Sequence, residues 1–280
     1  MTASERAIEH VAGQVKSGSP VHPELRITLN FHPDRLHDGR LMLAKLVADG
    51  VYLSQFATAT SNGGLTAHPG GDRWRWESRI FGGVYDDSPP RERPVYGALN
   101  FRRRSVGAAP RFGSAHFRLT AEAVHRSTFC YPDSWLEPTA FGVADRMPLI
   151  ALAEADRQAA LTADDPHEYD ELNDYIEAQT HGPVRLDTDV EALVLDPCYR
   201  GTEVEAVAAE LPCLIEWHPG FRLHVDELVK HPDYRGQQYV DLGLRIAEHG
   251  WLDPYVIGKA VREHDPQDVK KVWHYLARFS

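Results

Sequence analysis

The sequence predicts an α+β fold, in which a mixed or antiparallel β-sheet is flanked by helices and followed by a helical C-terminal segment. Short segments of alternating apolar and polar residues, typical of strands, recur between residues 25 and 195. Helical patterns lie between them, and only helical patterns follow residue 226. The 280 residues, 42% hydrophobic and 25% charged, are enough to form a buried core.

The first part of the chain alternates between helical and strand-like segments. Residues 3–16 predict a short helix that serves as a cap or a pairing arm. Residues 25–31 alternate and are rich in strand formers, and Pro33 ends this predicted strand. Residues 41–48 have a helical pattern, and residues 51–56 predict a second strand.

A glycine-rich stretch follows and is interpreted as a long loop over residues 58–83. Loops of this length in a compact domain are usually functional or disordered. Trp74 and Trp76 argue against disorder, because aromatic residues are scarce in disordered segments.

The central part of the chain predicts most of the sheet. A hairpin is expected to join residues 174–186 to residues 190–195, with its turn at Asp187-Thr188-Asp189. The other expected elements are strands at 95–102, 115–119 and 126–131, and helices at 148–160 and 204–210.

Three helices are expected at the C-terminus, over residues 240–248, 254–263 and 266–279. Asp253-Pro254 and Asp265-Pro266 are typical helix starts, because aspartate caps free N–H groups and proline tolerates the first turn. The expected domains are an N-terminal helical arm (1–24), an α+β domain (25–223) and a helical appendage (224–280).

Charge is distributed unevenly along this acidic chain, whose net charge is −11. Residues 72–126 contain 11 arginines and no lysine, whereas residues 154–210 contain 16 acidic residues. The net charge disfavours non-specific binding of nucleic acid or anionic membranes. Arginine is favoured where phosphate is held by two hydrogen bonds, so the arginine-rich stretch either binds an anion or pairs with the acidic stretch.

Several common sites have no support in the sequence. It contains neither a dinucleotide-binding G-x-G-x-x-G nor a P-loop, and neither H-E-x-x-H nor G-x-S-x-G. Five of the 15 histidines precede proline, which is typical of turns, and no metal is expected. The absence of an apolar N-terminal segment predicts a cytoplasmic protein with no signal peptide, although delivery as an effector stays open.

The segment Tyr175-Ile176-Glu177-Ala178-Gln179 carries the most informative pattern. On a strand, Tyr175, Glu177 and Gln179 share one face, and the two apolar residues point to the other. A rigid strand can mount a carboxylate inside a cleft as an electrostatic catalyst. Spacing alone leaves open an edge strand with one solvated polar face.

This segment resembles the glutamate strand of the ADP-ribosyltransferase superfamily, which includes toxins and poly(ADP-ribose) polymerases. Further segments resemble its earlier motifs, in the same order: 31–35 at the end of the first strand and 55–64 after the second. The family places Glu or Gln two residues before its catalytic Glu, whereas Glu177 precedes Gln179 here. The whole chain also resembles an uncharacterised bacterial family of unknown function, through blocks at 96–101, 112–119 and 126–129 that are similar to phage-borne toxin domains.

The superfamily resemblance covers residues 25–200. It implies a fold of split mixed or antiparallel sheets, and it also implies an enzymatic activity. The protein would cleave the nicotinamide–ribose bond of NAD, its substrate, and transfer ADP-ribose to an unknown acceptor or to water. The acceptor would be protein, nucleic acid or a small molecule. As the catalytic group, Glu177 would stabilise positive charge on the ribose, and Gln179 would orient the acceptor or the ribose.

The resemblance also implies residues that bind NAD. His32 or Arg35 would be the ligand from the first strand, and Arg35 or an arginine of residues 73–126 would hold the diphosphate. Tyr96 or Trp74 would stack on nicotinamide. The nicotinamide ribose would be supported by Thr60, Ser61, Asn62 and Gly63.

Two other functions stay open at this point. A non-catalytic binding module is one, because a transferase-like fold can persist after its chemistry is lost. A metal-dependent hydrolase or nuclease that uses the histidines and the acidic stretch 164–196 is the other. Bound NAD without turnover would indicate the first, and bound divalent metal the second.

Overall fold

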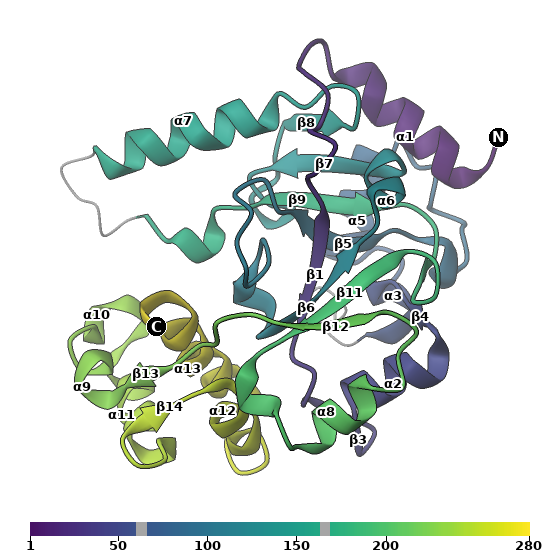
Figure 1. Cartoon of the computed structure of the whole chain (residues 1–280). Helices are drawn as coiled ribbons and strands as arrows, with labels where there is room; N and C mark the ends of the chain where they lie inside the picture. Colours follow the sequence, from purple (N-terminus) through teal and green to yellow (C-terminus); the bar gives the residue numbers. More distant parts are fainter. Residues whose placement is uncertain (60–65, 163–168) are drawn as a thin grey trace.

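The computed structural model describes residues 1–59, 66–162 and 169–280 of the chain. Its centre is one eight-stranded sheet in the order β12-β11-β6-β1-β5-β9-β7-β8 (Figure 1). All neighbours are antiparallel except β11 and β12, which are parallel. The strands are β1 (Ile27–Phe31), β5 (Val95–Leu99), β6 (Ala115–Leu119), β7 (Ser127–Tyr131), β8 (Ala140–Val143), β9 (Ile176–Thr180), β11 (Val190–Leu195) and β12 (Leu214–Trp217).

Within the described residues, three small two-stranded sheets lie outside the main sheet. They pair β2 (Leu36–His37) with β3 (Arg40–Leu41), β4 (Val51–Tyr52) with β10 (Val184–Arg185), and β13 (Leu223–His224) with β14 (Trp251–Leu252). The mixed sheet and its flanking helices confirm the predicted α+β class.

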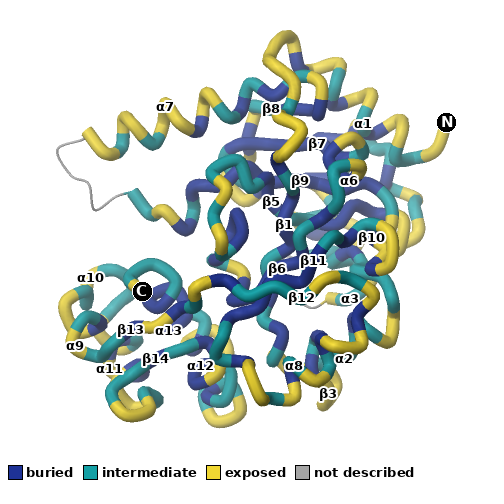
Figure 2. The backbone as a smooth tube through the Cα atoms, viewed as in Figure 1, coloured by how far each residue is buried: buried dark blue, intermediate teal, exposed yellow. Residues whose placement is uncertain are grey.

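Helices cover both faces of the main sheet. The helices of the described residues are α1 (Ala3–Gln14), α2 (Met42–Asp49), α3 (Gln55–Thr58), α5 (Asp72–Ile80), α6 (Ala121–His125), α7 (Leu149–Leu161), α8 (Glu203–Ala208), α9 (Val225–Leu228), α10 (Pro232–Arg235), α11 (Gln237–Ile246), α12 (Pro254–Ala260) and α13 (Pro266–Phe279). Side chains of α2, α6, α7 and α8 join the main core, and α1 and α5 pack in a second cluster with Cys130 of β7 and Val143 of β8. Figure 2 shows the strands at the centre as buried and the outer helix faces as exposed.

The C-terminal helices form around a hydrophobic cluster of their own, which contains Leu252, Val272 and Trp273. Their starts are capped as the sequence predicts. The Asp253 carboxylate accepts from the Val256 N–H at 2.8 Å, and the Asp265 carboxylate accepts from the Gln267 N–H at 2.7 Å. The division of the chain at residues 24 and 223 stays a prediction.

Three sequence-based expectations are wrong. The expected hairpin does not form, because β9 pairs with β5 and β7 while β11 pairs with β6 and β12. Gly182, with φ 81°, and Pro183 end β9, and the next residues pair with β4 instead.

Residues 72–80, expected in the long loop, form α5, since Trp76 and Ile80 bury one helical face. The strand expected at 51–56 stops at Tyr52, and α3 follows.

Candidate active site

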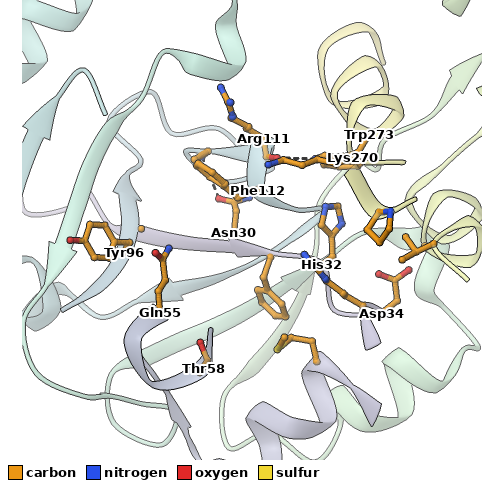
Figure 3. A pocket seen from close by; sticks show the side chains of 18 of the residues that line it. Asn30, His32, Asp34, Gln55, Thr58, Tyr96, Arg111, Phe112, Lys270 and Trp273 are labelled. Carbon is orange, nitrogen blue, oxygen red and sulfur yellow. Dashed lines mark hydrogen bonds between the residues drawn. The ribbon is translucent and has the colours of Figure 1, made fainter. Parts of the chain in front are cut away.

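A cavity of about 510 Å³ is lined on one side by strands of the main sheet and on the other by α12 and α13. This volume lies within the roughly 300–1,000 Å³ that is common for small-molecule sites. Figure 3 shows side chains from both sides converging on it. Its lining side chains with polar groups are Thr28, Asn30, His32, Asp34, Arg35, Tyr52, Gln55, Thr58, Arg73, Tyr96, Arg111, Tyr175, Glu177, Arg262, Gln267, Lys270 and Trp273.

Glu177 lies on β9, in the interior of the sheet. Its neighbours across the strands are Ala98 of β5 and Cys130 of β7. Ile176 and Ala178 point into the main core on the other face, as the alternating pattern predicts. Glu177 is only 7% exposed, which excludes the solvated edge strand that spacing alone leaves open.

Four donors hold the Glu177 carboxylate in place, and the weakest is Cys130 Sγ, at 3.7 Å from Oε1. Gln179 Nε2 donates to Oε1 at 3.0 Å, and Ser134 Oγ donates to Oε2 at 3.0 Å. The Ser134 N–H also approaches Oε2, at 3.4 Å. Burial raises the pKa of Glu177, whereas the Arg73 charge acts to lower it. The result is a fixed carboxylate that faces the cavity.

Arg73 of α5 lies between Ser134, which holds this carboxylate, and the ring of Tyr96. Its Nη1 donates to Ser134 Oγ at 2.7 Å, and its guanidinium lies 4.2 Å from the centre of the Tyr96 ring. The Tyr96 hydroxyl donates to Glu77 Oε1 at 2.9 Å, and Glu77 pairs with Arg93 at 2.7 Å. A buried polar network therefore fixes this end of the cavity.

The cavity lining is strongly cationic in an acidic protein. Among the described lining residues there are five cations and two carboxylates, those of Asp34 and Glu177; the cations are Arg35, Arg73, Arg111, Arg262 and Lys270. Burial, with Arg111, Lys271 and Arg35 nearby, lowers the pKa of Lys270 to about 8. The arrangement fits a ligand with at least two negative charges.

The end of the cavity next to the C-terminal helices is aromatic. The His32 and Trp273 rings meet edge to face, with their centres 4.9 Å apart. Burial, together with the charges of Arg35 and Lys270, lowers the pKa of His32 to about 3. His32 is therefore a neutral imidazole at physiological pH and adds no charge.

The structure brings together only part of the residue set predicted from the sequence. Glu177, His32, Arg35 and Tyr96 line the same cavity. Gln179 lies behind Glu177 and accepts from Thr128 Oγ1 at 3.0 Å, and Trp74 of α5 is not part of the lining. Thr60, Ser61, Asn62 and Gly63 lie outside the described residues.

Sequence reasoning did not single out several lining residues. Asp34 lay in the segment 31–35 but was given no role, and Arg73 and Arg111 were only part of the arginine-rich stretch. Ser134, which contacts Glu177 without lining the cavity, had no motif to mark it. Lys270 lies on α13, and Arg262 follows α12; both belong to the segment that was expected to form a helical appendage. Only the packing of α12 and α13 against the site reveals them.

The described parts of the chain offer neither a metal site nor a membrane-spanning helix. Among residues 1–59, 66–162 and 169–280, no group of three or more His, Cys, Asp or Glu side chains is arranged to bind a metal ion. No helix in these ranges is long and apolar enough to span a bilayer. The cytoplasmic location stays a prediction.

Comparisons with known proteins give a family and one distant structural likeness. The structure of "Thermus sp. 2.9 DarT in complex with NAD+" is similar to 71% of this chain and 98% of its own, with 15% identity and a TM-score of 0.40. The search of curated proteins found no match. Residues 26–159 and 148–279 match the family described as "Protein of unknown function (DUF3626)". The chain belongs to this uncharacterised family, as its sequence blocks predict.

Proposed function

We propose that the protein cleaves the nicotinamide–ribose bond of NAD and transfers ADP-ribose to an acceptor or to water. The observation that carries this proposal is the buried Glu177 carboxylate at one end of a cavity with five cationic side chains. Binding and cleavage of a dinucleotide use both features. Its diphosphate requires cations, and its ribose requires a group that stabilises positive charge.

In the proposed complex, the nicotinamide ribose lies at Glu177 and the nicotinamide ring lies near Tyr96. The diphosphate contacts Arg111 and Lys270, and the adenosine extends toward His32. The bond from ribose C1′ to nicotinamide nitrogen breaks, and its electron pair leaves with nicotinamide. Glu177 stabilises the resulting oxocarbenium ion. The acceptor or a water molecule then bonds to C1′ and loses a proton.

Residues around Glu177 have supporting roles in this proposal. Ser134 and Gln179 are positioning residues that hold the carboxylate of Glu177 through hydrogen bonds. Arg73 orients Ser134 and carries a charge that favours ionised Glu177. Thr60 to Gly63 stay proposed contacts of the nicotinamide ribose.

The first test is incubation of the purified protein with NAD. We expect nicotinamide release, measured by chromatography, and a rise in Tm with NAD, because a ligand of the folded state stabilises it. Addition of EDTA should leave the rate unchanged. Binding without nicotinamide release would contradict the enzyme and favour a binding module. Turnover that EDTA abolishes would favour the metal-dependent alternative.

Lys270→Ala provides a more specific test of the diphosphate position. We expect NAD affinity to fall roughly tenfold or more, because a charge-assisted contact is lost, and its salt dependence to weaken. Calorimetric titration at low and high salt measures both effects. Lys259→Ala is the matched control, since Lys259 lies on α12, pairs with Glu248 and does not line the cavity. Equal affinity in Lys270→Ala and the parent would exclude this contact.

A further inference from the structure

Asp34 is a carboxylate of the cavity that the proposed reaction does not use. It follows β1 and lines the cavity. In Figure 3, Asp34 and Tyr96 lie at opposite sides of the cavity, so Asp34 is remote from the end that holds Glu177. It is the only carboxylate besides Glu177 among the described lining residues.

Two neighbours fix the Asp34 carboxylate from behind. The Tyr199 hydroxyl, which is fully buried, forms a hydrogen bond with it. Gly258 of α12 lies so close that a Cβ at that position would meet Asp34 Oδ2 at 1.8 Å. The carboxylate therefore packs directly on the α12 backbone, and only glycine leaves room for it.

The surroundings of Asp34 suit a nucleoside. His32 and Trp273 offer aromatic edges, and Ile257 and Val261 add apolar surface. Arg262 is a cation of the same lining, and its charge favours the ionised carboxylate. Burial raises the pKa of Asp34 to about 7, so the group is mostly ionised at pH 8.

We infer that Asp34 binds the ribose of the adenosine half and makes the cavity selective for NAD over NADP. This inference rests on the proposed function, which places the nicotinamide ribose at Glu177 and so the adenosine at the opposite end. A carboxylate accepts hydrogen bonds from a ribose 2′-hydroxyl, as in other dinucleotide sites, and repels a 2′-phosphate. If Asp34 becomes neutral, Arg262 is left to attract that phosphate.

The test compares NAD and NADP binding at pH 8 in a Glu177→Gln background, which slows turnover. We expect this parent to bind NAD about tenfold or more tightly than NADP, by calorimetric titration. Adding Asp34→Asn should reduce the preference to about threefold or less, mainly through tighter NADP binding. Asp38→Asn is the control: it removes one acidic charge from a side chain that is 90% exposed, and it should leave the preference unchanged.

A second variant covers the case in which Asp34→Asn fails to fold. Gly258→Ala in the same background displaces the carboxylate without removing it, and we expect the same loss of preference. Equal affinities in the parent, or an unchanged preference in both variants, would overturn the role of Asp34 while NAD binding remains. A folded parent that binds neither dinucleotide would overturn the proposed function as well.

Discussion

Glu177→Gln is expected to reduce nicotinamide release from NAD by about 10²–10³-fold, the usual loss when one group that stabilises a charged transition state is removed. The amide has nearly the shape of the carboxylate, and its oxygen keeps an acceptor for one of the two donors, Ser134 or Gln179. It lacks the negative charge that the oxocarbenium ion requires. Initial rates at saturating NAD measure the loss, which should appear mainly in kcat.

The pH dependence of the parent gives an independent check of the same residue. Burial raises the pKa of Glu177, and the ionised form is the active one. Activity should therefore be lost as pH falls through a pKa above the ordinary glutamate value. Glu122→Gln, at an exposed position of α6, is the control and should keep the parental rate and profile. Full turnover in folded Glu177→Gln would remove the central assignment.

Arg93→Ala is expected to destabilise the fold by about 3–5 kcal/mol, because it leaves the Glu77 carboxylate buried without its partner. Arg93 is 3% exposed and Glu77 is fully buried. The guanidinium also donates to the Tyr85 carbonyl at 2.5 Å and lies 4.1 Å from the centre of the Phe56 ring. Denaturant titration at pH 8 measures the loss.

The loss in Arg93→Ala should shrink as pH is lowered from 8 to 5. Burial raises the pKa of Glu77 to about 7 even with Arg93 opposing it, and removing Arg93 raises that pKa further. A group whose pKa is higher in the folded than in the unfolded state stabilises the fold at pH values below the unfolded-state pKa. This stabilisation is lost as the pH rises through the folded-state pKa. Adding Glu77→Gln should recover part of the stability at pH 8.

A neighbouring exposed arginine supplies the control for Arg93. Arg91→Ala changes the same charge at an exposed position of the same segment, and it should alter stability by no more than about 0.5 kcal/mol. If Arg93→Ala unfolds at the same denaturant concentration as Arg91→Ala, the buried pair does not hold α5 to the sheet.

Local sequence patterns were sufficient to predict features that depend on residues close together in the chain. Alternation placed β1, β6, β7 and β9, because successive side chains of a strand point to opposite faces. Aspartate followed by proline marked the starts of α12 and α13 through hydrogen bonds within one turn. The same alternation put Glu177 on the face opposite Ile176 and Ala178, and this is confirmed.

Local sequence patterns could not predict which distant strands pair with each other. The expected hairpin relied on proximity in sequence, but β9 fills the gap between β5 and β7, where both of its faces are buried. Alternation specifies which face of a strand is apolar but not which strand lies beside it. The helix α5 was missed because the glycines before it dominate the local composition.

The sequence by itself therefore determined the fold class, the face that carries Glu177 and the capped C-terminal helices. Only the tertiary structure decided that Arg73 and Ser134 reach this carboxylate, and that Asp34, Arg262 and Lys270 share its cavity. The physical reason is that strand periodicity and capping act within a few residues. A cavity, in contrast, forms where segments that are distant in the sequence pack together, such as those that hold Asp34 and Lys270.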